Sequence, residues 1–554
     1  MALRFVSNSQ NLIDYGNLRT LVVDDIPGMR SALKMTLANF GVTRTDVAST
    51  AQEAIYRIGN TAYDLILADY NLGEGRDGQQ LLEELRHRGL IGLQTAYVMV
   101  TAESIYEKVA ATAELAPDDY LLKPFNGEVL RNRLDAILHR KMAFHQIHAL
   151  FEAGDLEGAI AACDVLIQAK PRYLVDALRF KGELLNAMGR FEEAEALYMQ
   201  VIVMRAVPWA RLGLARAQHA AGREEESEQV LLDALEATPE MVAAYDLLAE
   251  VRIARKDMQG AQQALEAGVA ISGRTVRRQQ QLGELAYDNG DLHAAEAAFQ
   301  ATLEKGRHSI FVSHADYGNL CRAQVEQGNL HGALDTLKKG RDTLQLSPEG
   351  QLVTAVVQSM VHTRAGQAEA AQRFLDEASR LREDGVHGDS RLMLDLAGSY
   401  MAGGRHDEGD AVVNEVARNA HDSDALLGKA RDIYARCGRA DAGEQVLQQA
   451  TAGVRQLNNE GVYLAQKGDF DGAIQRLLTA AREAAYNPRV LMNAAWVLLR
   501  DIDTNGLKED KLQEAKRLLD EVERLVPGHG RLPGLRTHVR EIEARYGISR
   551  RAAS

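Results

Sequence analysis

The chain has 554 residues, which is more than one hydrophobic core usually serves, so several folded units are expected. Its net charge is −14 at pH 7, and most of the acidic excess follows residue 142, which argues against nucleic acid as a main ligand. The three cysteines, Cys163, Cys321 and Cys437, lie far apart and form no CxxC motif, so neither a disulfide framework nor a zinc site is indicated.

The first 142 residues alternate short apolar runs with helical stretches. An N-terminal extension, residues 1–17, comes first. Strands are then expected at 18–25, 43–49, 63–69, 95–102 and within 118–125, and helices at 27–40, 50–60, 77–88, 103–114 and from Asn126 to Met142. Five apolar strands that alternate with helices predict a doubly wound parallel sheet with helices on both faces. Residues 18–142 should form this domain.

Polar residues stand at the carboxyl ends of the expected strands, where ligands gather in such sheets. They are Asp24, Asp25, Asp69, Thr101 and Lys123. Each has a simpler explanation when taken alone, because a strand-end aspartate can be solvated or can cap the next helix. Their combination, in order along the chain, favours a functional site.

A repeated pattern begins after residue 142. Segments such as GDLEGAIAACDVLI (154–167) and GDFDGAIQRLLTA (468–480) resemble one another, and a small residue recurs about every 34 residues. These small residues are Ala159, Ala194, Ser227, Ala261, Ala295, Ala333, Ala371, Gly409, Gly443, Ala473 and Ala515. Each unit is expected to form two helices joined by a turn, often with a glycine at the turn. About eleven repeats over residues 143–530 are expected, followed by a capping helix and tail at 531–554.

The two parts of the chain resemble two known protein families. The first 140 residues resemble the receiver domains of response regulators, through the Asp24–Asp25 pair, Asp69, the run that starts at Thr101, and Lys123 with the proline and phenylalanine after it. The remainder resembles tetratricopeptide repeats. Together they imply a flavodoxin-like α/β receiver followed by an all-α solenoid.

The receiver resemblance implies a phosphorylation site that uses magnesium. Asp69 would accept the phosphoryl group, and Asp25 and Asp69 would bind Mg²⁺ directly. The backbone carbonyl of Asn71 would be a further ligand, and Asp24 would act through water. Oxygen ligands of this kind suit magnesium.

The same resemblance implies a phosphate-binding and switching set. Lys123 and Thr101 would contact the phosphoryl oxygens, and the Lys123–Pro124 peptide bond would be cis. Tyr120 would be the switch aromatic, although ordinary half-buried packing explains this residue from the sequence alone. One segment departs from the family: residues 69–78 lack the usual proline and are one residue longer, which leaves the loop conformation open.

Two hypotheses about function follow. In the leading one the chain is a two-component response regulator and not an enzyme: phosphorylation of Asp69 by a sensor histidine kinase or phosphotransfer protein modulates the binding of an unknown protein partner by the repeat array. In the alternative, the receiver is a phosphate sink that dephosphorylates itself, and the array only docks it to a kinase complex. A homodimer is possible in either case.

The remaining expectations concern location and excluded ligands. No apolar stretch is long enough for a membrane span or a signal peptide, so a cytoplasmic protein is expected. No helix-turn-helix segment or basic stripe supports nucleic-acid binding.

Overall fold

The computed structural model describes residues 13–102, 116–169, 171–204, 207–273, 275–526 and 531–548. They divide into two compact units. The first comprises residues 1–282 with 304–312, and the second comprises 283–303 with 313–554. Among the described residues, no helix is both long enough and apolar enough to cross a membrane.

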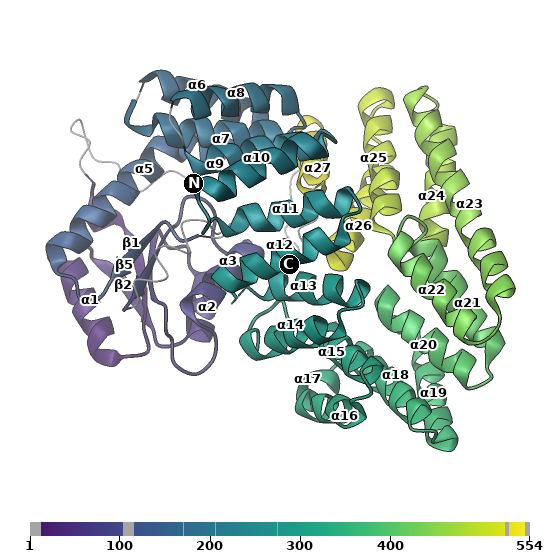
Figure 1. Ribbon diagram of the computed structural model, residues 1–554. Coiled ribbons are helices and arrows are strands. Elements are labelled where there is room, and N and C mark those ends of the chain that lie inside the picture. The colour runs from purple at the N-terminus through teal and green to yellow at the C-terminus, as the bar shows by residue number, and fades with distance from the viewer. Residues whose placement is uncertain are drawn as a thin grey trace. The chain divides into compact units, whose positions relative to one another are not determined.

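The N-terminal domain is an α/β fold, as the sequence predicts (Figure 1). Its parallel sheet has the order β2-β1-β3-β4-β5. The strands are β1 (Arg19–Val23), β2 (Arg44–Ala48), β3 (Leu65–Asp69), β4 (Ala96–Thr101) and β5 (Asp119–Leu122). The helices described in this domain are α1 (Pro27–Asn39), α2 (Ala51–Asn60), α3 (Gly78–His87) and α5 (Gly127–Ala153). The helix expected at 103–114 lies outside the described residues. A short turn, η1 (Tyr15–Asn17), precedes β1.

Two hydrophobic layers hold the sheet between its helices. One layer packs β-strand residues such as Val22, Leu67 and Val98 against α1 and α5. The other packs Leu21 and Ile66 against α2 and α3. Because alternate strand residues point to opposite faces, near-continuous apolar strands can fill both layers, which is why the sheet is buried on both sides.

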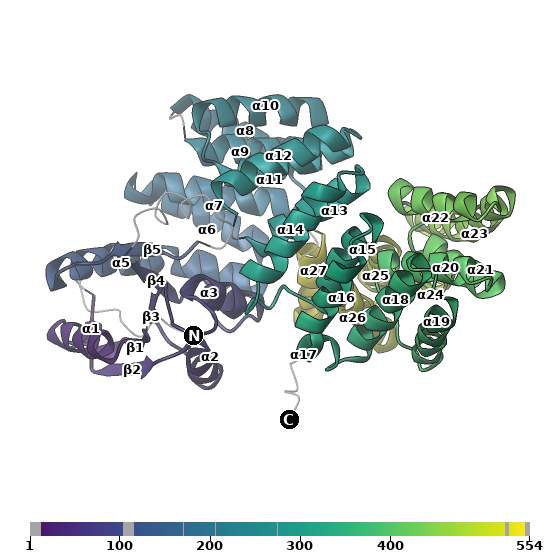
Figure 2. The same ribbon diagram turned by 60° about the horizontal axis from the view of Figure 1, so that its bottom comes forward.

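Helix α5 belongs to two cores. It begins with Asn126 as its cap and runs without a break for 27 residues until Gly154, which adopts a left-handed conformation. Its first half buries Leu130 and Leu134 in the core of the N-terminal domain. Its second half buries Phe144 and Ile147 in the first core of the array. The boundary expected at residue 142 therefore falls inside one rigid helix (Figure 2).

The rest of the chain is helical, as the sequence predicts. Most of the helices follow one another as antiparallel pairs joined by short turns. They are α6 (Leu156–Ala169), α7 (Leu174–Ala187), α8 (Phe191–Met204), α9 (Pro208–Ala220), α10 (Glu224–Ala237), α11 (Val242–Ala254), α12 (Met258–Ile271), α13 (Val276–Asp288), α14 (Leu292–Lys305), α15 (His314–Glu326), α16 (Leu330–Lys339), α17 (Arg341–Leu344), α18 (Pro348–Arg364), α19 (Ala368–Glu383), α20 (Ser390–Ala402), α21 (His406–Asn419), α22 (Asp424–Arg436), α23 (Ala440–Gln466), α24 (Phe470–Glu483), α25 (Pro488–Asn505), α26 (Glu509–Leu525) and α27 (Leu532–Arg545). A short turn, η2 (Pro171–Tyr173), separates α6 from α7.

The recurrent small residues lie where paired helices approach most closely. Ala159, Ala194 and Ala295 are fully buried. A Cβ atom at Gly443 would lie 2.4 Å from the ring of Tyr434, so a larger residue there would push the two helices apart. The glycines at the turns have positive φ angles, and in the repeat without a turn glycine Lys256 takes this conformation with φ 64°.

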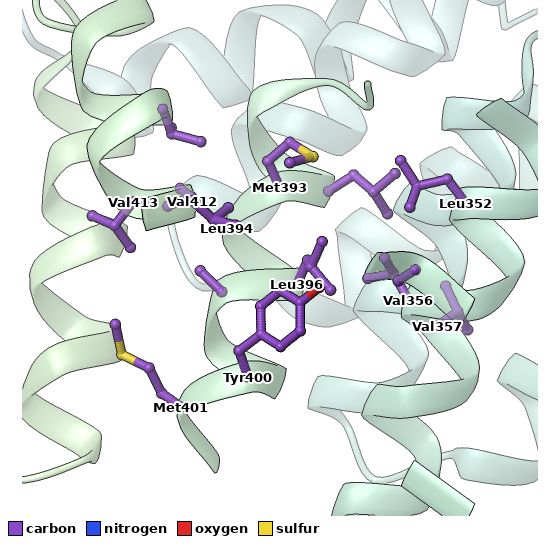
Figure 3. Packing of buried hydrophobic residues seen from close by; sticks show 14 of the residues in the cluster. Leu352, Val356, Val357, Met393, Leu394, Leu396, Tyr400, Met401, Val412 and Val413 are labelled. Carbon is purple, nitrogen blue, oxygen red and sulfur yellow. The ribbon is translucent and has the colours of Figure 1, made fainter. Parts of the chain in front are cut away.

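Within one hydrophobic cluster of the second unit, the core continues from helix pair to helix pair between α15 and α23. Figure 3 shows Tyr400 and Leu396 of α20 between Val356 of α18 and Val412 of α21, all buried in one cluster. Each helix pair thus completes the core of its neighbours, as expected for a solenoid.

Ion pairs also join helices of this unit that are far apart in sequence. Asp288 of α13 accepts hydrogen bonds from Arg391 of α20 at 2.6 and 2.8 Å and from Lys429 of α22 at 2.6 Å. Arg322 of α15, 3% exposed, pairs with Asp395 of α20 at 2.5 Å. The first helices of the pairs therefore meet one another through charged side chains as well as through their apolar neighbours.

Candidate functional site

Three carboxylates meet at the edge of the parallel sheet where its strands end. Asp24 and Asp25 follow β1, and Asp69 ends β3, the strand that pairs with β1. One oxygen of each lies within 4.8 Å of the others. Asp24 and Asp69 are buried and Asp25 is exposed, so the group opens to solvent on one side. Three hard anionic ligands at this spacing could hold a divalent cation such as magnesium.

One lysine pairs with both buried carboxylates. The ammonium group of Lys123 lies 3.2 Å from Asp24 and 3.0 Å from Asp69. Lys123 follows β5 in the chain. Its backbone N–H donates to the carbonyl of Thr101 at 2.7 Å, which extends the β4–β5 pairing to the site. The Lys123–Pro124 peptide bond is cis. The Lys123 side chain is 18% exposed, so the ammonium remains accessible to an incoming anion.

The first turn of α1 holds Asp24 in place. One oxygen of its carboxylate accepts a hydrogen bond from the backbone N–H of Ile26 at 2.8 Å, while the other accepts from Lys123. The guanidinium of Arg30 donates to the backbone carbonyl of Asp24. Sequence reasoning did not select Arg30, because an arginine on the first turn of a helix carries no signal of its own.

The environment of Asp69 raises its pKa. Burial is the largest cause, and the neighbouring Asp24 charge acts in the same direction. The hydrogen bond and charge of Lys123 act the other way and favour the carboxylate. A cation beside the three carboxylates would further stabilise the ionised form, which is the form that can act as a nucleophile.

The loop after Asp69 is shaped by glycines. Gly73 has φ 75°, and its N–H donates to the side-chain oxygen of Asn71 at 3.2 Å. At Gly78 a Cβ atom would lie 2.3 Å from the backbone oxygen of Asp69. The N–H of Gly78 donates to the carbonyl of Tyr70 at 2.7 Å, which closes the loop onto α3. The segment between Asp69 and α3 thus turns through glycines and contains no proline. Gly78 was not selected from the sequence.

The two expected switch residues lie on adjacent strands. Thr101 ends β4 at the site and is 2% exposed. Tyr120 lies on β5 opposite Met99 and is half-buried against the layer that α2 and α3 cover. Burial raises the pKa of Tyr120 well above its usual range, and the charge of Glu83 on α3 adds to this shift. The Tyr120 phenol is therefore a neutral group beside α3.

Comparison with known proteins agrees with this geometry. The response regulator receiver domain family matches residues 20–135. The chemotaxis protein CheY-3 of Vibrio cholerae serotype O1 is 30% identical over 130 residues, which are 22% of this chain and 94% of that protein. The chain belongs to the response regulators. The response regulator also contains tetratricopeptide repeats, which match at residues 175–198 and 208–232.

Two solved structures are also similar to parts of this response regulator. The chemotaxis response regulator CheY4 of Vibrio cholerae is 26% identical, covers 22% of this chain and 98% of its own, and has a TM-score of 0.20. A tetratricopeptide repeat protein from Parabacteroides merdae is 15% identical, covers 46% of this chain and 96% of its own, and has a TM-score of 0.28.

A buried lysine ties α5 of the response regulator to the strands that carry the site. The ammonium of Lys141 donates to the backbone carbonyl of Leu93 at 2.7 Å and lies 2.7 Å from the carboxylate of Asp118. Asp118 also accepts from the backbone N–H of Tyr97 at 2.9 Å and directly precedes β5. Farther along α5, Glu152 accepts from the N–H of Leu93 at 2.9 Å. Lys141 was missed from the sequence because nothing in a helical repeat marks one lysine as buried.

Proposed function

We propose that this response regulator is a phosphorylation-controlled adaptor whose repeat array binds a partner protein. Asp69 is the phosphoacceptor, and a sensor histidine kinase or a phosphotransfer protein is the donor. The observation that carries the proposal is α5: one helix buries side chains in the receiver core and in the first array core. A rearrangement in the receiver therefore has a direct mechanical route into the array.

The chemistry needs positioning and charge neutralisation more than covalent help. An oxygen of the Asp69 carboxylate forms a bond to phosphorus while the bond from phosphorus to the donor nitrogen breaks. The electron pair of the broken bond stays on the imidazole that leaves. Lys123, 3.0 Å from Asp69, balances the charge of the phosphoryl oxygens. The hydroxyl of Thr101 donates a hydrogen bond to one of these oxygens.

Magnesium fits the donor set at this site. Asp25 and Asp69 would be direct ligands, the backbone carbonyl of Asn71 a third, and Asp24 would act through water. When bound, the cation would neutralise charge on the phosphoryl group and on the carboxylates. Asp25 is the exposed member of the group, so the site is open to solvent at this ligand.

Transmission starts at β5. Phosphorylation draws Thr101 toward the new phosphoryl group, and the ring of Tyr120 moves into the space left behind. Tyr120 lies two residues after Asp118, which is held by the buried Lys141 of α5. A shift of β5 therefore acts on α5 through this ion pair. A change of about 1–3 kcal/mol between the two states would alter partner affinity by about 5- to 150-fold.

The phosphate-sink alternative makes a different prediction about the array. It requires phosphorylation of Asp69 but no change in what the array binds. The compartment proposed for either function is the cytoplasm, where kinases of this class act on their substrates.

Two measurements test the proposal. First, the protein is incubated with a small phosphodonor and Mg²⁺, and the modified residue is mapped by mass spectrometry. Asp69→Asn should lose the labile modification, and the control Asp46→Asn, on β2, should keep it. Second, proteins that co-purify with the array are identified, and their affinity is measured with and without beryllofluoride. A labelled Asp69 with equal affinities in both states would favour the phosphate sink, and a labelled Asp69→Asn would contradict the site itself.

A further inference from the structure

One face of α3 carries three polar side chains, Gln80, Glu83 and His87, and is called the α3 face below. Their spacing of three and four residues places them on the same side of the helix. The opposite side of α3 buries Leu81, Leu82 and Leu85 against the sheet. The α3 face is therefore not needed for the receiver core.

The array contacts the α3 face through the end of α14 and the residues that follow it. This stretch, residues 304–312, belongs to the same compact unit as the receiver and is called the return segment below. The rings of His87 and Phe311 lie 5.4 Å apart, edge to face. The side-chain amide of Gln80 donates to the backbone carbonyl of Lys305 at 3.4 Å.

A charged contact accompanies these two. The guanidinium carbon of Arg277, on α13, lies 4.3 Å from the centre of the Phe311 ring. Burial is the largest cause of the raised pKa of Glu83, while a hydrogen bond from the side-chain amide of Gln79 at 3.2 Å and, as the smallest cause, the charge of Arg277 act in the opposite direction. Glu83 is thus a partly desolvated carboxylate on the helix that Phe311 contacts.

The return segment is held in a fixed shape by the array itself. The side chain of Gln280 donates to the carbonyl of Phe311 at 3.0 Å, and the ammonium of Lys305 donates to the carbonyl of Gly273 at 2.9 Å. Within the segment, the N–H of Ser309 donates to the carbonyl of Gly306 at 2.7 Å. A preformed segment loses little conformational entropy when it docks, so even a small contact can be stable.

The α3 face is also close to the switch residue. Tyr120 packs against the hydrophobic layer that includes the buried side of α3, and the charge of Glu83 adds to its raised pKa. When the Tyr120 ring moves toward Thr101, the packing of this layer beneath α3 changes, and with it the position of the α3 face.

From these contacts we propose that the α3 face is a docking surface for the return segment of the same chain, and that phosphorylation of Asp69 releases it. The receiver and the array are then joined at two places, through α5 and through this contact. The release rests on the proposed function, whereas the contact does not. The free return segment exposes Phe311, which becomes available to another protein.

Hydrogen–deuterium exchange on the full-length protein tests the contact. The variants are Phe311→Ala and Arg277→Glu, and the matched control is Leu346→Ala, since Leu346 is a strongly exposed apolar residue elsewhere in the array. Both variants should raise exchange in peptides that cover 78–88 and 304–312 by about 5-fold, and the control should not. Unchanged exchange in Phe311→Ala would overturn the contact.

The release is tested by adding beryllofluoride and Mg²⁺ to the wild type and to Asp69→Asn. Exchange in 304–312 should rise in the wild type only. If exchange changes around Thr101 and Tyr120 but stays slow in 304–312, the release is wrong and the proposed function stands. If beryllofluoride changes exchange nowhere, the proposed function fails, while the contact is still judged by the variants.

Discussion

The ammonium of Lys141 lies 2.7 Å from the carboxylate of Asp118, although one residue is on the helix that enters the array and the other directly precedes a receiver strand. Lys141 is 6% exposed, and burial lowers the pKa of its ammonium while Asp118 acts in the opposite direction. A buried charge of this kind is stable only while its partner remains in place. The pair is therefore sensitive to the position of β5.

Lys141→Met should destabilise the receiver by about 3 kcal/mol, because it leaves the buried Asp118 carboxylate without its nearest charge. Chemical denaturation followed by circular dichroism measures this change, and Lys34→Met, an exposed position on α1, is the control. A second variant, Asp118→Asn combined with Lys141→Met, should cost less than the sum of the two single changes. Strict additivity would show that the pair does not interact.

Asp25→Ala should weaken Mg²⁺ binding at least about tenfold, since it removes a direct carboxylate ligand and one negative charge. Isothermal titration with MgCl₂ gives the affinity. Asp25 is the exposed member of the carboxylate group, so the variant should keep its fold. Asp46→Ala, which removes the same charge from β2, should leave the affinity unchanged. Equal affinities of Asp25→Ala and wild type would remove Asp25 from the ligand set.

Gly78→Ala should reduce both the stability of the receiver and the rate of phosphorylation. An added Cβ would lie 2.3 Å from the backbone oxygen of Asp69, so the strand that carries the phosphoacceptor must shift. A clash of this kind costs about 1–3 kcal/mol. Gly59→Ala, on α2 with open space around the added carbon, is the matched control and should be neutral or stabilising. Normal phosphorylation of Gly78→Ala would mean that the loop adapts freely.

The stability of the α5 junction should depend on pH through His148. Burial lowers the pKa of this imidazole to about 4, and its ring packs 5.5 Å from Phe180. Because the unfolded chain binds a proton at a higher pH than the folded chain, stability is complete above about pH 6.5 and is lost as the pH falls toward 4. The loss attributable to His148 at pH 5 is about 2 kcal/mol.

His148→Phe should remove this part of the pH dependence, since phenylalanine fills the same aromatic cluster without titrating. Denaturation at pH 7.5 and pH 5 in both proteins gives the difference, and groups common to both cancel. His145→Phe, one turn away and less buried, is the comparison. A wild type that loses no more stability than His148→Phe between the two pH values would contradict the assignment.

Much of the fold could be predicted because it depends on local sequence patterns. The apolar runs that end at Asp25 and Asp69 predicted the strands, and parallel pairing then brought their ends to one edge. Ala159 and the small residues that recur about every 34 positions after it predicted the helix pairs, because close packing of two helices needs a small side chain at their contact. The roles of the site residues stay predictions.

The rest depends on contacts between residues that are distant in the chain. Asp288 meets Lys429, 141 positions later, and His87 meets Phe311, and no periodicity in the sequence connects either pair. Lys141 reads as a solvent-exposed helix residue until the neighbouring strands are known. Gly78 is needed because of the backbone of Asp69, nine residues before it, and one sequence gives no sign of this requirement.

The unbroken course of α5 also limits how the gene can change. One residue added between Leu138 and Phe144 would rotate everything after it by about 100° and move it by about 1.5 Å relative to the receiver. Lys141 and Phe144 could then no longer face their own partners together. Only an insertion of about seven residues, which adds two complete helical turns, would bring both side chains back to the same side of the helix as before. Related sequences in which one helix joins the receiver to the array should therefore keep the length of that helix, while the turns between later helix pairs vary freely in length.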